Sequence, residues 1–410
     1  MPRNILTALD IGTSTVQTVV AEKKPGEDLR LLGIGVASSS GVRRGVVVDM
    51  EEAVNSIRRS LDDARRSAGL PIKSAWVGVG GSHISVASSR GVVAVSRADG
   101  EISPEDVRRA ITAAETFVSK NPNKEILHMI PRDFRVDQEN GIKDPVGMHG
   151  VRLEVDAMVI ECSVSFLKNL LKCVEGAGLH VEDYVFSPLA AAEGVLSKRQ
   201  KELGVMLLDI GGGTASFIVF EEGVPLHAGV VPIGGNHITN DVAIGFRTHV
   251  DIAERIKVTH GTCLPADLPK RDSIRLAEFV PEESTVFSRR ELAEIIEARF
   301  CDIFELLQKE LKKIDRLQLL PAGVVLVGGS SLVPGLMELA KREIKLPIEL
   351  GVPKILAGMD EQTAPSFASV LGVLHWADAQ THIESVSWGG RKVLGFGKST
   401  WVRWLRSLLP

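Results

Sequence analysis

The stretch that decides the fold is Leu9-Asp10-Ile11-Gly12-Thr13-Ser14-Thr15-Val16-Gln17-Thr18-Val19-Val20-Ala21-Glu22. It returns as Leu208-Asp209-Ile210-Gly211-Gly212-Gly213-Thr214-Ala215-Ser216-Phe217-Ile218-Val219-Phe220-Glu221. Leu, Asp, Ile, Gly, Thr, Val and Glu match position for position at an offset of 199 residues. Each copy predicts an apolar strand that ends in an acid, a turn of small residues and a second apolar strand. Because internal duplication indicates a repeated architectural unit, the chain is expected to have two related halves.

The chemistry of the two turns points to phosphate. Turns of Gly, Ser and Thr expose backbone N–H groups, which phosphate oxygens need as donors. A carboxylate beside such a turn is explained if a hydrated Mg²⁺ lies between it and the phosphate. One isolated copy would favour an ordinary hairpin. Two copies in register predict instead a nucleotide held from both sides, with Mg²⁺ positioned through its waters by Asp10 and Asp209.

The composition is that of a soluble globular protein of several domains. The 410 residues carry 48 basic and 52 acidic side chains, a net charge of −4, with 44% hydrophobic and 24% charged residues. This balance excludes a strongly basic surface, so no nucleic-acid partner is expected. The cysteines lack metal-ligand spacing, and no apolar run is long enough to span a membrane. Without a signal peptide, the chain is expected to be cytoplasmic.

The order of expected elements predicts α/β halves around a cleft. Strands are expected at 4–9, 16–22, 30–38, 74–79, 84–88, 91–95, 125–130, 133–137, 152–161, 179–186 and 324–327. Helices are expected at 51–68, from 103, and at 165–176, 189–196, 236–246, 251–259, 289–314 and 334–344. Residues 83–162 behave as an insert, and the polar, Gly-rich residues 378–399 are interpreted as a linker.

Five segments, in order, resemble the superfamily of actin, sugar kinases and heat-shock chaperones. They are the two phosphate hairpins at 9–16 and 208–215, the connecting helices around 187–196 and 361–374, and the adenosine motif at 325–335. Within this superfamily the chain is similar to the FtsA family of bacterial cell-division proteins, on residues 144–155 of the insert and on 247–257. The resemblance covers essentially the whole chain.

The resemblance implies an actin-like, ribonuclease-H-like duplicated fold with two lobes around a nucleotide cleft and an inserted small α+β subdomain. The implied divisions are a first-lobe core at 1–82 (continued at 163–193 and 355–377), the insert at 83–162, a second-lobe core at 194–235 (continued at 306–354), a small second-lobe subdomain at 236–305, a flexible linker at 378–399 and an amphipathic membrane-targeting helix at 400–410.

The resemblance also implies that ATP and Mg²⁺ bind in the cleft. The implied nucleotide contacts are Gly12, Thr13, Ser14, Thr15, Gly211, Gly212, Gly213, Thr214, Gly234, Gly235, Glu254, Lys257, Gly328, Gly329 and Ser330. Glu254 and Lys257 stand three apart on one helical face, where they would reach the ribose and the base edge. Without the family match this pair would favour a surface ion pair, and Gly328-Gly329 would fit a plain strand-to-helix turn.

Two positions depart from the pattern of the superfamily. Members often carry Lys where this chain has Thr15, so one cationic phosphate contact is missing. Related chaperones and filaments start the first connecting helix with Glu-Pro, and that acid orients the attacking water. The chain has Ser187-Pro188 there, and a serine is a poor proton acceptor. We therefore expect ATP binding with slow hydrolysis at most, to which Asp10 and Asp209 contribute by positioning the metal.

The C-terminal tail has the pattern of an interfacial helix. After Glu384 the sequence contains no acidic residue, and wound at about 100° per residue its apolar side chains from 401 to 409 fall within an arc of about 160°. Such a helix places apolar side chains in the acyl boundary and cations at anionic headgroups. Docking of the tail on its own domain remains the alternative. The membrane-facing residues are expected to be Trp401, Arg403, Trp404, Leu405, Arg406, Leu408 and Leu409.

Together these features predict an ATP-binding, actin-like protein that polymerises on the inner face of the cytoplasmic membrane at the division septum. The resemblance implies that its partner is the tubulin-like protein FtsZ, whose C-terminal peptide would bind the subdomain at 236–305 through Arg290 and Arg299. It implies that the insert handles filament contacts and later division proteins. The alternatives are a PilM-type pilus-assembly adaptor, which shares the hairpins, and a metabolic sugar kinase.

Overall fold

The structure, a computed structural model, describes residues 4–118, 121–354 and 359–385. Its first lobe is built on a five-stranded sheet in the order β11-β6-β1-β2-β3. The strands β1 (Asn4–Ile11), β2 (Thr15–Lys23) and β3 (Arg30–Ser38) are antiparallel, whereas β6 (Ser74–Val79) and β11 (His180–Phe186) run parallel to β1. β1 and β2 are buried along most of their length because helices cover both faces of this sheet.

The second lobe repeats the first. Its sheet has the order β14-β13-β12-β17-β18, in which β12 and β13 take the places of β1 and β2. The strands are β12 (Val205–Ile210), β13 (Ala215–Glu221), β14 (Val224–Val231), β17 (Val324–Val327) and β18 (Ile348–Leu350). The predicted duplication is therefore confirmed in the topology, and each acidic residue lies next to last on its strand.

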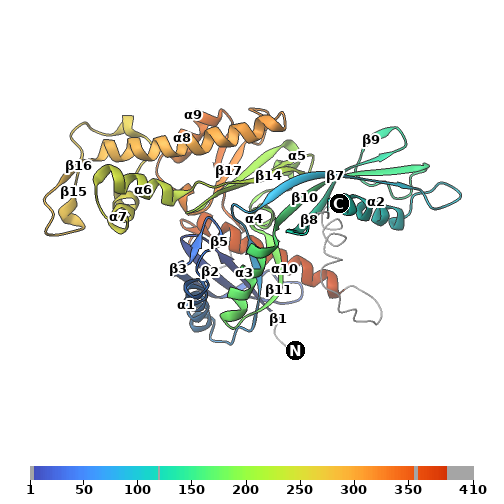
Figure 1. Cartoon of the computed structure of the whole chain (residues 1–410), viewed down its shortest axis with the longest axis horizontal. Coiled ribbons are helices and arrows are strands. Elements are labelled where there is room, and N and C mark those ends of the chain that lie inside the picture. Colours follow the sequence, from blue (N-terminus) through green and yellow to red (C-terminus); the bar gives the residue numbers. More distant parts are fainter. Residues whose placement is uncertain (1–3, 119–120, 355–358, 386–410) are drawn as a thin grey trace.

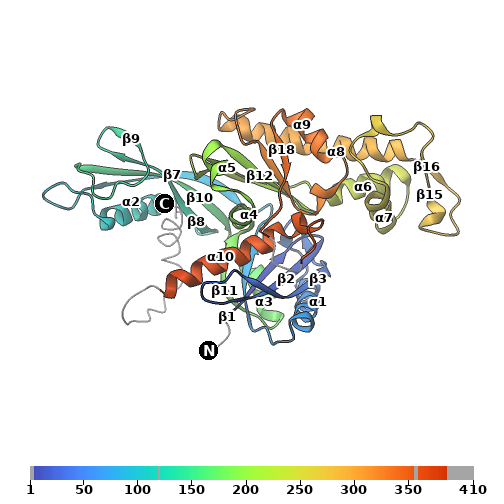
Figure 2. The same cartoon turned by 180° about the vertical axis from the view of Figure 1, so that it is seen from behind.

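Two helices cross between the lobes with their backbones in contact. They are α4 (Ser187–Val195) and α10 (Ala368–Ser385), and Figure 2 shows α10 running past α4 between the two sheets. A Cβ on Gly372 of α10 would lie 2.3 Å from the carbonyl oxygen of Ala190 in α4. One hydrophobic core takes residues from both sheets and both helices, so the lobes are joined by continuous packing.

The insert is a four-stranded sheet, in the order β7-β10-β8-β9, with one helix. It lies at one end of the long axis of the molecule, and the small subdomain of the second lobe, residues 236–305, lies at the other end (Figure 1). Its elements are β7 (Ser85–Ala94), α2 (Pro104–Val118), β8 (Lys124–Val136), β9 (Glu139–Ile142) and β10 (Arg152–Ser163). The insert is connected in sequence to the first lobe, but it also contacts the second lobe. Arg132 of β8 donates to the carbonyl oxygen of Leu226 in β14 at 3.1 Å.

The remaining helices flank the two sheets. Helix α1 (Met50–Ala68) begins at Asp49, whose carboxylate accepts from the Glu52 amide, and ends at Gly69, where φ is 65°. The other α-helices are α3 (Val164–Gly176), α5 (Lys198–Leu203), α6 (Gly235–Phe246), α7 (Val250–His260), α8 (Arg289–Lys313) and α9 (Leu336–Ile344). Short elements complete the fold: β4 (Val42–Arg43), β5 (Val46–Val47), β15 (Ser273–Arg275), β16 (Val286–Ser288), and 3₁₀ turns at Pro265–Asp267, Leu276–Glu278, Gly329–Leu332 and Ala364–Phe367.

Two predicted breaks in the insert are wrong. Residues 84–88 and 91–95 were expected as two strands but form one strand, β7, because Gly91 does not turn the chain. A Cβ on Gly91 would lie 1.9 Å from the carbonyl oxygen of Ala110, so this glycine lets α2 pack closely. Residues 125–130 and 133–137 are likewise one strand, β8, with a bulge beside Pro131.

Two further predictions, both near the end of the chain, need correction. The second connecting helix, expected around 361–374, begins at Ala368 and continues to Ser385. The first eight residues of the predicted linker, 378–385, are thus helical. Lys23 holds Asp378 at 3.0 Å and Gln380 is buried, so polar residues there pack instead of forming a linker. The rest of the linker and the tail at 400–410 lie outside the described residues. Within the described part, no helix has the length and apolarity of a membrane span.

Candidate functional site in the cleft between the lobes

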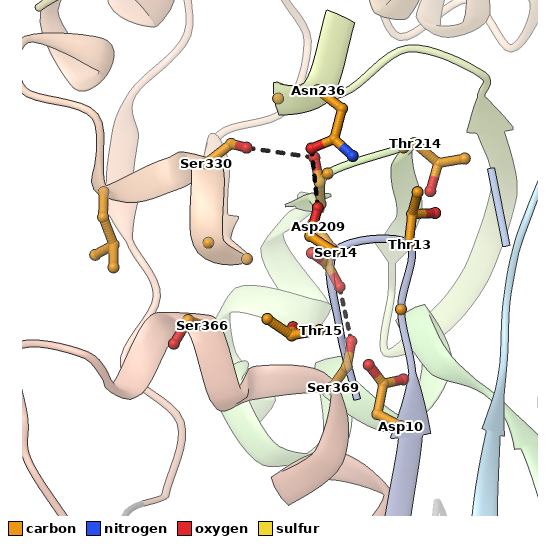
Figure 3. Close-up of a pocket in the computed structure, with 18 of the residues that line it drawn as sticks. Asp10, Thr13, Ser14, Thr15, Asp209, Thr214, Asn236, Ser330, Ser366 and Ser369 are labelled. Atoms are coloured by element: carbon orange, nitrogen blue, oxygen red, sulfur yellow. Dashed lines mark hydrogen bonds between the residues drawn. The ribbon is translucent and has the colours of Figure 1, made fainter. Parts of the chain in front are cut away.

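A cavity of about 750 Å³ lies between the lobes, lined by both acidic hairpins. Figure 3 shows side chains of the first turn, at Thr13 and Ser14, and of the second lobe, at Thr214 and Asn236, around one space. Ser14 Oγ donates to Asn236 Oδ1 at 2.9 Å across the cleft. The volume is that of a typical small-molecule or cofactor site.

The two turns touch each other, which explains the glycines of the second turn. A Cβ on Gly212 would lie 1.9 Å from Ser14 Oγ, and a Cβ on Gly213 would lie 2.4 Å from Thr13 Oγ1. Their backbone amides are therefore left uncovered by side chains of their own. The closed cleft requires glycine at both positions, in addition to any contact with phosphate.

Each carboxylate is bonded by a serine near the start of a connecting helix. Ser187 Oγ, from α4, donates to Asp10 Oδ1 at 3.4 Å, and Ser369 Oγ, from α10, donates to Asp209 Oδ2 at 2.7 Å. The arrangement follows the duplication of the fold. The chain therefore orients both acids from the helices that join the lobes.

Enclosure raises the pKa of both acids. Burial, and next the negative charge of Asp209, raise the pKa of Asp10 to about 7, which the bond from Ser187 partly offsets. Burial likewise raises the pKa of Asp209, against the opposing bond from Ser369. Two enclosed carboxylates that repel each other would be stabilised by a cation placed beside them. Within the described part of the chain no group of three or more His, Cys, Asp and Glu residues could hold a metal, so phosphate and water oxygens would have to complete the shell.

The second lobe supplies a mixed polar and apolar wall. Lys257 Nζ donates to Glu254 Oε2 at 2.6 Å, to Thr239 Oγ1 at 2.8 Å and to the Gly235 carbonyl at 3.2 Å. The ammonium therefore uses its three hydrogens within the protein, whereas the Glu254 side chain is 45% exposed. Apolar side chains of this wall include Val258, Ile296, Leu332 and Val333.

The turn at Gly328 comes close to the Asp209 carboxylate. This residue has φ of 89°, and a Cβ on it would lie 2.3 Å from Asp209 Oδ1. A side chain is excluded there, while at Gly329 the space around a Cβ is open. Ser330 Oγ donates to the Gly211 carbonyl at 3.3 Å and so connects the turn after β17 to the hairpin of β12 and β13.

Family models and curated relatives agree on one family. A model described as cell division protein FtsA matches residues 206–372, and a model of the SHS2 domain inserted in FtsA matches residues 81–161. Cell division protein FtsA of Pseudomonas aeruginosa is 39% identical over 371 residues, which cover 90% of this chain and 88% of the relative. The chain belongs to the FtsA family. FtsA of Bacillus subtilis is 38% identical over 386 residues, covering 94% of this chain and 85% of the relative.

Solved structures confirm the actin-like fold. The PilM-PilN type IV pilus biogenesis complex matches with a TM-score of 0.68 and 18% identity, covering 92% of this chain and 99% of that one. MreB5 of Spiroplasma citri bound to ADP matches with a TM-score of 0.53 and 13% identity, covering 93% and 99%. Both likenesses concern the fold alone. As a member of the FtsA family, the chain is a bacterial cell-division protein.

The cleft brings together all of the predicted nucleotide contacts except one. Gly234 does not line the cavity: it packs behind the second turn, where a Cβ would lie 2.4 Å from the Gly211 carbonyl oxygen. The residues that do line it are Gly12, Thr13, Ser14, Thr15, Gly211, Gly212, Gly213, Thr214, Gly235, Glu254, Lys257, Gly328, Gly329 and Ser330, with Asp10 and Asp209.

The two arginines predicted to meet a partner lie on α8, away from the cavity lining. Arg299 donates to both oxygens of Asp241, at 2.7 and 3.0 Å, and so ties α8 to α6. Arg290 pairs with Glu294 at 3.2 Å, and its side chain is more exposed than that of Arg299. Their role toward FtsZ stays a prediction.

Sequence reasoning missed Ser369 and Asn236. Ser369 lies 160 residues from the acid it bonds, and Asn236 lies 222 residues from Ser14. The sequence does contain an indication of Ser369. The duplication that relates Asp10 to Asp209 predicts that a residue on the second connecting helix corresponds to Ser187 on the first.

Proposed function

We propose that this FtsA-family chain binds Mg²⁺-ATP in the cleft, polymerises on the inner face of the cytoplasmic membrane at the septum, and tethers FtsZ there. The observation that supports nucleotide binding best is the pair of serine-bonded carboxylates, Asp10 and Asp209, enclosed between two touching glycine turns. Such turns are the usual partners of phosphate, and the acids suit a hydrated cation.

Different residues of the cleft would contact different parts of ATP. The amides of both turns would hold the phosphates, and Glu254 would meet the ribose. Lys257 would reach the base edge by giving up one of its three hydrogen bonds within the protein. Mg²⁺, held through its waters, would neutralise phosphate charge. Because Ser187 lies where an acid would orient the attacking water, we propose that hydrolysis is slow and that ATP acts chiefly as an assembly cofactor.

The raised pKa of Asp10 predicts a pH dependence for this binding. Mg²⁺ requires the ionised carboxylate, and the pKa of Asp10 is about 7. Affinity for Mg²⁺-ATP, measured by calorimetry, should therefore fall about tenfold between pH 8 and pH 6. Asp10→Asn should weaken binding and flatten the pH profile, leaving the titrations of Asp209 and of the nucleotide itself. Equal pH profiles for the two proteins would contradict this assignment.

The raised pKa of Asp10 also predicts how the stability of the ligand-free protein changes with pH. A carboxyl whose pKa is raised from 3.8 to about 7 on folding holds its proton better in the native state. Its contribution to stability is fully present below about pH 4 and is lost as the pH rises through about 7. Bound Mg²⁺-ATP should reverse this trend.

Anchoring is assigned to the tail by its sequence. Trp401 and Trp404 alternate with Arg403 and Arg406, a combination that favours the interface of an anionic membrane. One short helix binds weakly, but many copies along a polymer bind together. Polymerisation through the actin-like body and anchoring through the tail thus support each other.

Pelleting with vesicles tests the anchor. The full chain with ATP and Mg²⁺ should pellet with anionic vesicles and recruit FtsZ into the pellet, and a chain lacking residues 398–410 should leave both in the supernatant. Trp401→Ala with Trp404→Ala, which keeps every cation, is the matched variant and should lose most of the binding. Full pelleting by the truncated chain would overturn the assignment.

The FtsZ contact is proposed for the subdomain at 236–305. Arg290 and Arg299 would receive carboxylates of the FtsZ C-terminal peptide, and the insert would carry filament contacts and later division partners. Because Arg299 is already paired with Asp241, Arg290 should carry more of the peptide affinity.

A further inference from the structure

The turn between β4 and β5 carries an arginine where arginine is unfavourable. Val42 pairs with Val47 and Arg43 with Val46, so Arg44 and Gly45 alone form the connection. Their φ angles are 51° and 74°. A two-residue hairpin with positive φ at both positions is of type I′, which favours Asn or Asp before Gly. A non-glycine residue in this conformation is worth tracing to a function.

The backbone of this turn is fixed against the nucleotide-binding hairpin. The Gly45 amide donates to Thr13 Oγ1 at 3.2 Å, and the Ser82 amide donates to the Arg44 carbonyl at 3.0 Å. A Cβ on Gly45 would lie 2.5 Å from the Cα of Gly81, and both glycines line the cavity. The Arg44 side chain therefore starts from a rigid position at the edge of the cavity.

From this position Arg44 reaches the opposite lobe. Its Nη2 lies 3.5 Å from Nε2 of His237, in the first turn of α6. Asn236, the preceding residue, lines the cavity and receives the bond from Ser14. The two side chains thus meet across the cleft beside the turns that would hold the phosphates.

The protonation of His237 is settled by its other nitrogen. The Gly234 amide can only donate, and it lies 3.1 Å from Nδ1, which must therefore accept. Burial, supported by the positive charge of Arg44, lowers the pKa of His237. The ring is neutral, with its proton on Nε2.

The contact between Arg44 and His237 is consequently one between two donors. A guanidinium has no acceptor atom, and Nε2 carries a hydrogen. Within the described ranges, no carboxylate forms an ion pair with Arg44. The exposed Arg44 side chain and the His237 ring thus bring two N–H groups from opposite lobes together beside the cavity, an arrangement that an anionic oxygen would satisfy.

We propose that Arg44 and His237 together bind the terminal phosphate of ATP and so distinguish ATP from ADP. This inference rests on the proposed nucleotide site. A γ-phosphate oxygen between the two donors would satisfy both and add a further link between the lobes when the third phosphate is present. Arg44 would then supply the cationic contact that is missing at Thr15. ADP does not carry the phosphate that would fill this position.

Variants at Arg44 separate this role from folding. Arg44→Asn supplies the residue that a type I′ turn favours, so the turn should be at least as stable. The dissociation constant for ATP should rise about tenfold, and that for ADP should change less than twofold. Arg43→Asn, which removes the neighbouring exposed arginine, is the matched control and should leave both constants unchanged.

Variants at His237 test the second donor. Gln and Glu at this third helical position can both accept the Gly234 amide, as in a capping box. His237→Gln keeps an N–H donor and should retain most of the preference for ATP. His237→Glu offers only acceptors and pairs with Arg44, so it should lose the preference as Arg44→Asn does.

Calorimetric titration of the full chain and the four variants with ATP and with ADP, in the presence of Mg²⁺, measures the two dissociation constants and tests the proposal. The proposal predicts loss of ATP affinity alone in Arg44→Asn and His237→Glu. Equal losses for ATP and ADP, or no loss, would overturn it and leave the nucleotide site standing. If the unaltered chain bound neither nucleotide, the proposed function itself would fail.

Discussion

Gly212→Ala should abolish tight nucleotide binding without unfolding the protein. Its Cβ would lie 1.9 Å from Ser14 Oγ and 2.9 Å from Asn236 Oδ1, so the two turns could no longer close on each other. An overpacked contact of this kind costs about 2.7 kcal/mol, which is about a hundredfold in the dissociation constant of ATP. Titration with a fluorescent ATP analogue measures the loss, and circular dichroism checks the fold.

A second substitution tests the physical reason. Ser14→Gly removes the side-chain atoms of Ser14 that Gly212→Ala would strike and leaves only the contact with Asn236 Oδ1. The double variant should therefore recover about tenfold of the lost affinity, a favourable coupling between sites in contact. Ser14→Gly alone should bind ATP more weakly than the unaltered chain because the bond to Asn236 is lost. If the double variant bound ATP no better than Gly212→Ala alone, closure of the turns would not be the cause.

Gly372→Val should destabilise the whole molecule. The Cβ would lie 2.3 Å from the carbonyl oxygen and 2.5 Å from an amide nitrogen of α4, and backbone atoms cannot yield as side chains do. We expect the free energy of unfolding to fall by about 3 kcal/mol, as in overpacked cores. Urea unfolding followed by tryptophan fluorescence measures the change.

The facing glycine is the matched control for this effect. A Cβ on Gly194 of α4 would lie 3.4 Å from the Cα of Gly372, an ordinary contact distance. Gly194→Ala should therefore be neutral, or stabilise by up to about 1 kcal/mol through helix propensity. Equal destabilisation by both substitutions would contradict the view that the crossing is tight only at Gly372.

What the sequence could predict was local pattern and its repetition. The string around Asp10 and its copy around Asp209 contain both central strands and both turns, so the two sheets and the cleft followed from them. Sequence patterns gave wrong predictions at residues whose role is a contact with a distant segment. Gly91 was taken for a break, but it makes room for a helix. Asp378 was taken for linker, but it pairs with Lys23 from β2.

The parts of the site that escaped prediction are all contacts between segments far apart in the chain. Ser369 bonds Asp209, Gly212 packs on Ser14, and Arg44 meets His237, each pair more than a hundred residues apart. No local spacing encodes such pairs. The duplication alone could have indicated Ser369, since it is the counterpart of Ser187 on the second connecting helix.

The central claim is that acids from both lobes hold one Mg²⁺-ATP between them. Calorimetric titration of ATP into the full chain, the Asp10→Asn variant and the Asp209→Asn variant, with Mg²⁺ and with a chelator, tests it most directly. We predict one ATP per chain with Mg²⁺, and at least tenfold weaker binding in the chelator and in each variant. Binding that is unaffected by Mg²⁺ and by both substitutions, or no binding at all, would contradict the claim.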